Sequence, residues 1–161
     1  MATDRVSVSR RIDASAATVF SVITEPRQHV EIDGSGMLMA TTNEQLRAVG
    51  DTFDMDMDRE PLGDLPMGKY KVRNTVTKLE PDVALEWNVG GVDQPPFGHV
   101  YGYELLAAGP SSTDVTLYCD WTGVRASSIR DRFPIVPVHM LEKSLDNLQR
   151  IVAGNGERLT P

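Results

Sequence analysis

Six successive segments alternate apolar and polar side chains, and this repeat of two constrains the fold more than any other feature of the chain. Such alternation is typical of β-strands with one buried face. The segments are 37–42, 51–58, 69–80, 83–90, 98–107 and 112–121. A parallel return would need a crossover of about a dozen residues or more, and the connections here are shorter. We therefore expect an antiparallel meander.

The stretch before the meander combines one strand with two short helices. "RVSVSRRI" at residues 5–12 alternates and predicts a first strand. "DASAATVFSVIT" then has a helical repeat, with Asp13 or Ser15 as the residue that caps its first turn. Pro26 disfavours helical geometry at the preceding residue and ends this helix. A second short helix through "RQHVEI" stops at "DGSG", whose glycines suit left-handed backbone.

The end of the chain predicts a long amphipathic helix that begins at Val138. Its apolar stripe consists of Leu141, Leu145, Leu148 and Val152. Gly154 and Gly156 are expected to end the helix, which leaves residues 154–161 as a flexible tail.

Length and charge narrow the classes of function. The 161 residues suit one domain, with a folded core at about residues 5–153 that can bury apolar side chains or surround a cavity. Lys and Arg number 16 against 23 Asp and Glu, which gives a net charge of -7 and a pI near 4.9. This balance argues against a nucleic-acid partner.

The N-terminal sequence and the cysteine content address location and thiol chemistry. "MATDRVSVSRRIDAS" has no apolar core of a signal peptide, and no run approaches the roughly 18 apolar residues that span a bilayer. We therefore expect a cytoplasmic protein. Cys119 is the only cysteine, so no internal disulfide can form. Its strand pattern indicates a small buried apolar residue rather than a nucleophile.

Residues 52–73, "TFDMDMDREPLGDLPMGKYKVR", place acids and bases on facing strands. Asp54, Asp56 and Asp58 share one face of their strand. Lys69, Lys71 and Arg73 share the same face of the next strand, so a hairpin would pair the two rows. We interpret the acids as this ladder and expect no metal site, because the calcium-loop pattern of an EF-hand is absent.

The opposite faces of the strands are expected to point inward, and they are not wholly apolar. Buried tyrosine hydroxyls are costly without partners. The polar side chains that converge there are Tyr70, Asn74, His99, Tyr101 and Tyr103. They indicate a polar spot inside a mostly apolar space. By contrast, His29 and His139 are expected at the surface or at helix ends.

Alternate turns of a meander emerge at the same end of the sheet, and one end is markedly apolar. Its three loops are "REPLGDLPMG", "GGVDQPPFGH" and "TGVRASSIRDRFPIVP". Leu65, Met67 and Phe97 are among the apolar residues in these loops. Clustered apolar residues on turns predict either a cap or the rim of an apolar opening, and we favour the opening.

The order of strand, two short helices, meander and long helix resembles the α+β helix-grip fold of the START/Bet v 1-like superfamily and its bacterial polyketide cyclase/dehydrase-like (SRPBCC) branch. The resemblance covers roughly residues 5–153. It is carried by "VSRRIDASAATVFSVITEP", with Ser15 where proline is common, and by "DGSG", "VTKLEPDVALEW", "YELLAAGPSSTDVTLYCDWTG" and "LEKSLDNLQRIV". It implies a curved antiparallel sheet around the last helix and a cavity between them.

The resemblance implies binding of a hydrophobic small molecule, lipid-like or polyketide-like, without metal or organic cofactor. The residues expected to bind the ligand are Phe53, Met55, Met57, Leu65, Met67, Tyr70, Val72, Asn74, Leu85, Trp87, Phe97, His99, Tyr101, Tyr103, Leu117, Cys119, Trp121, Leu141 and Leu145. The alternative is an aromatase/cyclase or dehydratase in which His99, with Tyr101 or Tyr103, transfers protons. A third reading is an interaction module whose apolar loops dock on a partner or make transient contact with a membrane. Monomer and homodimer both stay open.

Overall fold

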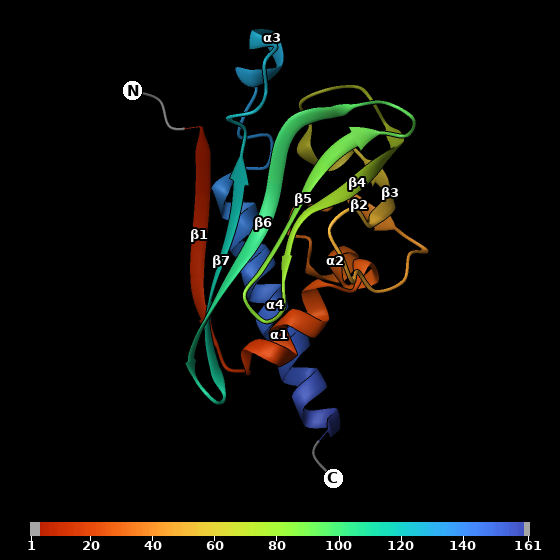
Figure 1. Cartoon of the computed structure of the whole chain (residues 1–161). Coiled ribbons are helices and arrows are strands. Elements are labelled where there is room, and N and C mark those ends of the chain that lie inside the picture. The colour runs from red at the N-terminus through yellow and green to blue at the C-terminus, as the bar shows by residue number, and fades with distance from the viewer. Residues whose placement is uncertain (1–3, 160–161) are drawn as a thin grey trace.

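A curved antiparallel sheet wraps around one long helix in the computed structural model, which describes residues 4–159 (Figure 1). The strands are β1 (Arg5–Ile12), β2 (Leu38–Ala40), β3 (Thr52–Asp58), β4 (Lys69–Glu80), β5 (Ala84–Gly91), β6 (Pro96–Gly109) and β7 (Ser112–Asp120). The helices are α1 (Ala16–Ile23), α2 (Pro26–Ile32), the 3-10 turn η1 (Glu60–Leu62), α3 (Ser127–Arg130) and α4 (Val138–Leu159). The strand order β1-β7-β6-β5-β4-β3-β2 confirms the meander, with β1 added beside β7.

Local signals set most of the boundaries as expected. Ser15 caps α1, because its hydroxyl oxygen accepts a hydrogen bond from the backbone N–H of Thr18 at 3.1 Å. Pro26 stands in the first turn of α2, where its missing N–H costs nothing. The expected stop of the last helix at Gly154 and Gly156 is wrong, since α4 continues to Leu159. A glycine lowers helix stability by only about 1 kcal/mol, which four preceding turns outweigh.

The "DGSG" segment fastens the two short helices to α4. A β-carbon on Gly34 would lie 2.2 Å from the carbonyl oxygen of Met140, so only glycine allows this approach. The backbone N–H of Gly34 donates to the Ser144 hydroxyl at 2.9 Å, and the Asn147 amide donates to the carbonyl of Ile32 at 2.9 Å. The glycine therefore serves close packing of helices as well as a turn.

The ladder between β3 and β4 has the expected register. Asp54 lies opposite Arg73, and Asp56 lies opposite Lys71. The Arg73 Nε donates to Asp54 Oδ1 at 2.7 Å, while the Lys71 ammonium lies 3.5 Å from Asp56. The acidic row is thus neutralised across the hairpin on the outer face of the sheet.

The two ends of the sheet differ as the turn counting predicted. The β3–β4 loop, the β5–β6 hairpin and the α3 segment gather at one end, whereas the β4–β5 and β6–β7 turns lie at the other (Figure 1).

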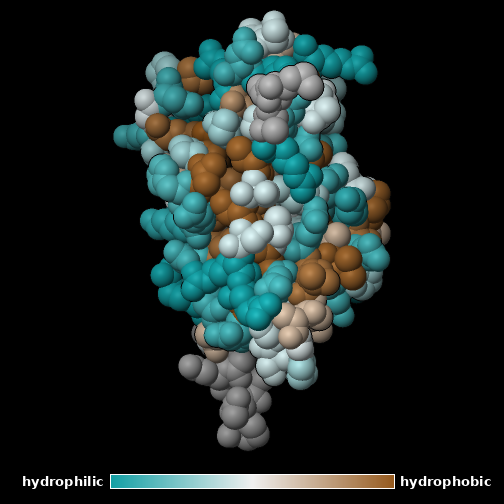
Figure 2. Space-filling model, turned by 90° about the vertical axis from the view of Figure 1, so that its left-hand side faces the viewer, coloured by the Kyte–Doolittle hydropathy of each residue, from teal (hydrophilic) through white to brown (hydrophobic). Residues whose placement is uncertain are grey.

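On the side of the molecule that β1 occupies, a central band of apolar side chains is visible between hydrophilic borders (Figure 2). No helix within residues 4–159 is long and apolar enough to cross a membrane.

Candidate functional site

A cavity of about 450 Å³ lies between the inner face of the sheet, α2, α4 and the apolar loops. This volume is within the range of small-molecule sites in proteins. Strands β3 to β7 supply one wall, and Leu141 and Ser144 of α4 supply part of the other. The loops contribute residues such as Leu65, Phe97 and Ile129. The site therefore has a floor made of strands and a rim made of loops.

Most of the residues expected to contact a ligand line this cavity. They are Met55, Met57, Leu65, Met67, Tyr70, Val72, Asn74, Trp87, Phe97, His99, Tyr101, Tyr103, Leu117 and Leu141. The repeat of two therefore identified the inner face correctly.

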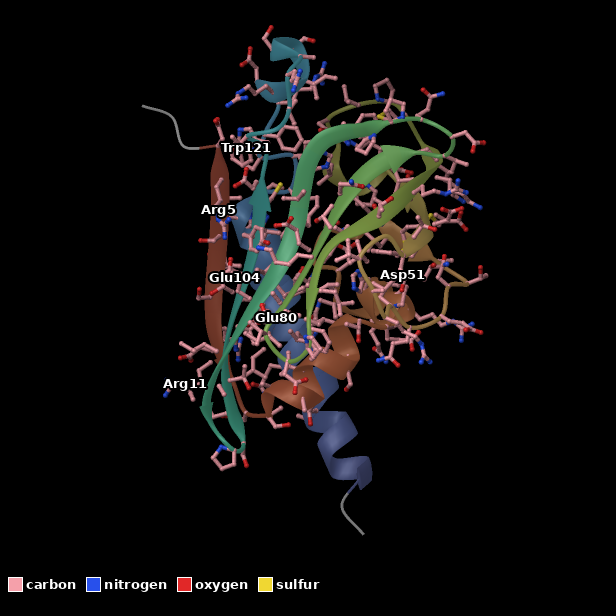
Figure 3. The ribbon with its side chains drawn as sticks, in the orientation of Figure 1. Arg5, Arg11, Asp51, Glu80, Glu104 and Trp121 are labelled. Carbon is pink, nitrogen blue, oxygen red and sulfur yellow. The ribbon has the colours of Figure 1, made fainter. Side chains whose placement is uncertain are left out.

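The other expected contacts lie elsewhere. Phe53, Leu85 and Leu145 are at most 2% exposed and pack within the main core, so neighbouring side chains fill the space around them. Cys119 and Trp121 belong to a second small cluster with Val124, and Trp121 stands just beyond the end of β7 (Figure 3). The geometry gives these five residues no place on the cavity wall.

His29 lies inside the molecule, so an expected place at the surface is wrong, although it stands in the last turn of α2, the helix end given as the other possibility. It lines the cavity and is 6% exposed. Its Nε2 donates to the backbone carbonyl of Ile23 at 2.6 Å, and its ring centroid lies 4.9 Å from that of Trp87. Burial lowers the pKa of His29, so the ring is neutral at pH 7. The signal for this placement was its spacing of three from buried Ile32 on α2.

Arg59 also lines the cavity, and the sequence pattern assigned no arginine there. It follows β3, and its guanidinium binds Asp64 through two hydrogen bonds of 2.8 and 2.7 Å. Interaction with Asp64, and then with Tyr70, raises its pKa further above the usual value. The alternation of the strand ends at Asp58, so periodicity could not orient the next side chain.

Asp33 is the acidic residue on the cavity wall, and its carboxylate is occupied by its own loop. Its Oδ1 accepts hydrogen bonds from the backbone N–H and hydroxyl of Ser35, at 2.9 and 2.6 Å. Its Oδ2 accepts one from the backbone N–H of Leu38 at 3.0 Å. Asp33 thus shapes the turn between α2 and β2.

Aromatic rings form much of the floor. The ring centroid of Trp87 lies 6.3 Å from Tyr101 and 6.0 Å from Tyr103. Burial raises the pKa of both tyrosines well above 10, so both hydroxyls stay protonated. Cys119 lies directly opposite Tyr101 on β7, and burial raises the pKa of its thiol to about 12. The thiol is therefore unsuited to nucleophilic chemistry.

His99 is enclosed by two rings of its own strand, β6, and by one ring of the loop after α3. Its centroid lies 4.8 Å from Phe133, 5.6 Å from Tyr101 and 6.2 Å from Phe97. Burial lowers its pKa to about 4. Its Nδ1 is buried and finds no hydrogen-bond partner among residues 4–159, and the same holds for Oδ1 of Asn74. Both side chains line the cavity.

Metal ligation finds little support in this arrangement. Across residues 4–159 no group of three or more His, Cys, Asp and Glu side chains is arranged to hold a metal ion. The arrangement instead offers an apolar, aromatic space with two unpaired neutral polar groups.

Comparisons with solved structures identify the class of fold: the chain has the START/Bet v 1-like helix-grip fold. Protein Ms6760 from Mycobacterium smegmatis superposes with a TM-score of 0.68 at 14% identity, covering 95% of this chain and 93% of the other. Norcoclaurine synthase from Thalictrum flavum, in complex with dopamine and hydroxybenzaldehyde, gives 0.63 at 17% identity, covering 95% and 88%.

Sequence comparison adds relatives of greater length. The chain is 33% identical over 118 residues to the uncharacterized protein Rv0088 of Mycobacterium tuberculosis strain H37Rv. The match covers 73% of this chain and 47% of that protein, so the chain spans about half the length of this relative. No protein-family model matches the chain.

Proposed function

We propose that the chain binds a hydrophobic small molecule, lipid-like or polyketide-like, in the cavity between the sheet and α4. One observation carries this proposal: an apolar space of about 450 Å³ remains inside a core whose other positions are closely filled. Protein interiors normally pack without such voids, because an empty cavity forfeits dispersion contacts. A site of this volume gains stability when an apolar ligand occupies it.

The loop end supports the same role. Met67, Phe97 and Ile129 are between 39% and 49% exposed although they are large and apolar, and all three also line the cavity. Their side chains connect the interior with solvent and provide an apolar route inward. Norcoclaurine synthase, a solved structure of the same fold, is in complex with dopamine and hydroxybenzaldehyde, which supports a small-molecule site in this fold.

Extraction tests the proposal directly. Protein purified under native conditions is denatured and extracted, and the extract is analysed by mass spectrometry. The expected result is a hydrophobic compound in the wild type that is lost in Val89→Trp, which fills the cavity from β5. Val83→Trp, in the exposed turn at the opposite end, is the matched control and should retain the compound. Equal recovery from both variants would contradict cavity binding.

The alternative function is that of a polyketide cyclase or dehydratase, and the unpaired Nδ1 of His99 favours it. A proton-transfer group must reach its substrate, and His99 and Tyr101 line the same space. The lowered pKa of about 4 makes His99 a weak base near pH 7, which favours binding over catalysis. Turnover of a poly-β-ketone that vanishes in His99→Phe and Tyr103→Phe would decide for the enzyme.

A further inference from the structure

The polar atoms of the cavity wall differ in whether they have hydrogen-bond partners. Arg59 is held by Asp64, and the Asp33 carboxylate is occupied by backbone and hydroxyl donors of its own turn. Asn74 and His99, which are 6% and 5% exposed, instead keep Oδ1 and Nδ1 without any partner in residues 4–159. Leaving a buried polar atom unpaired is costly, so each such atom in a folded protein calls for an explanation.

A comparison with Asn88 sharpens the contrast. Its Oδ1 is also buried and unpaired, but Asn88 is half-buried and does not line the cavity. It follows Trp87 on β5 and therefore points to the opposite, outer face of the sheet. The two unpaired groups inside the molecule are thus the ones that an enclosed ligand would meet.

Asn74 and His99 lie in one transverse row of the sheet. Asn74 on β4 pairs with Val89 on β5. Val89 in turn faces the part of β6 between Pro96 and Val100, which contains His99. This follows because the two neighbours of Val89, Asn88 and Gly90, pair with Val100 and Pro96. The two polar groups are therefore two strand spacings apart, roughly 10 Å between backbones. A molecule lying across the strands reaches both.

The chemistry of the two groups defines what they can bind. The unpaired Oδ1 of Asn74 is an acceptor, whereas Nδ1 of a neutral imidazole is a donor in one tautomer and an acceptor in the other. Burial keeps His99 neutral at pH 7, so neither group carries charge there. A charged ligand group at Asn74 or His99 would lose its hydration without gaining a counter-ion there. Arg59 and Asp33 are already engaged, and Arg132, the third charged residue on the wall, is exposed in the loop after α3. Hydroxyl and carbonyl groups incur no such penalty.

We propose that the ligand is an uncharged, flat apolar molecule with polar groups at two separated positions: a hydroxyl that donates to Oδ1 of Asn74, and a hydroxyl or carbonyl bound by Nδ1 of His99. This assignment rests on the proposed function and deepens it. It separates the ligand from fatty acids and other anionic lipids, which carry one charged end. The aromatic floor of Trp87, Tyr101 and Tyr103 suits the flat face of such a molecule.

Four naphthalene probes test the assignment by calorimetric titration of the full chain. They are naphthalene, 2-naphthol, naphthalene-2,6-diol and 2-naphthoate, which share a ring system and differ in polar groups. In wild-type protein we expect each hydroxyl to tighten binding roughly three- to tenfold, with the diol tightest and the naphthoate weaker than 2-naphthol.

Variants then assign each hydroxyl to a residue. Asn74→Leu and His99→Phe should each remove most of one hydroxyl's contribution, so the ratio of naphthalene Kd to diol Kd falls three- to tenfold. Asn88→Leu, which removes the equivalent atom from the outer face, should leave that ratio unchanged. Thermal unfolding and naphthalene binding by each variant establish that it is folded.

The outcomes distinguish failure of this assignment from failure of the proposed function. Three results would overturn the assignment alone. They are naphthalene binding with no preference for the diol, tighter binding of 2-naphthoate than of the diol, and a preference for the diol that persists in both variants. Failure of every probe to bind wild-type protein, naphthalene included, overturns the proposed function and the assignment together.

Discussion

The guanidinium of Arg59 and the carboxylate of Asp64 form two parallel hydrogen bonds across the base of the β3–β4 loop. The Arg59 side chain is 8% exposed and that of Asp64 is 43% exposed, so the loop folds an outer carboxylate onto an inner cation. Leu65 and Met67 of the same loop line the cavity. The pair therefore holds one side of the rim in place.

Breaking this pair should destabilise the protein more than breaking an exposed one. Asp64→Asn leaves a buried guanidinium without its counter-charge, and we expect a loss of about 1–2 kcal/mol in the free energy of unfolding. Asp56→Asn is the matched control, because Asp56 and Lys71 are both about half exposed. It should cost less than about 0.5 kcal/mol. Chemical denaturation measures both, and equal losses would contradict the role given to Arg59.

The burial of His99 predicts a pH dependence of stability. Its pKa is about 4 in the folded protein against 6.5 ordinarily, so between these values the unfolded chain binds a proton that the folded chain does not. The contribution of His99 to the free energy of unfolding is therefore fully present above pH 6.5. It is lost as the pH drops toward 4, by up to about 3 kcal/mol. His29, whose pKa is also lowered, adds to the loss in the same direction.

Replacing His99 isolates its share of this slope. His99→Phe should show a shallower fall in the free energy of unfolding between pH 6.5 and 4, measured by urea denaturation at several pH values. His139→Gln alters a histidine that is exposed and should keep the wild-type slope. An unchanged slope in His99→Phe would show that the imidazole is not shielded from water.

Strand periodicity carried most of what the sequence could predict. Each expected strand exists, and the inner faces of β3, β4 and β6 supply Met55, Val72 and Tyr101 to the cavity as expected. A repeat of two fixes which face a side chain occupies, but not where along the strand the cavity ends. That is why Leu85 and Cys119, on the correct face, lie beyond its wall.

Arg59 escaped prediction because it lies beyond the end of its strand, and His29 because its two-turn helix gives only a short helical repeat. Arg59 is placed by its pairing with Asp64, and His29 by the docking of a two-turn helix against Trp87 and Phe53. Both depend on contacts distant along the chain or on loop geometry. Both glycines of the "DGSG" segment were expected for their backbone freedom. Gly36 confirms this with a φ of 80°, whereas Gly34 is required by the approach of Met140.

Gly34 yields a test of how tightly α2 and α4 are joined. Gly34→Ala places a methyl group 2.2 Å from the Met140 carbonyl and 2.9 Å from the Ser144 nitrogen, so α4 must move. We expect a loss of about 2–3 kcal/mol, typical of overpacking. Gly154→Ala meets nothing within 4 Å and lies within α4, so it should stabilise by a few tenths to about 1 kcal/mol. Thermal unfolding distinguishes the two, and stabilisation by both would refute the close contact.

Phe133 connects the rim of the cavity to the titration of His99. The two ring centroids are 4.8 Å apart, and Phe133 also stacks on Trp121 at 5.5 Å. Removing the phenyl ring in Phe133→Ala admits water to the imidazole and relieves the burial that lowers its pKa. We therefore expect the pKa of His99 to rise from about 4 toward 6.5, as followed by NMR titration of the ring protons.

Met67→Ala is the control for this experiment, because Met67 also lines the cavity but comes from the β3–β4 loop rather than from the rings around His99. In this variant the pKa of His99 should stay near the wild-type value, because the rings that enclose His99 are intact. If Phe133→Ala and Met67→Ala raise the pKa of His99 equally, then general loosening of the loop end, and not the phenyl ring, governs access of water. If neither raises it, His99 is shielded by the strands alone and the loop end is not the route into the cavity.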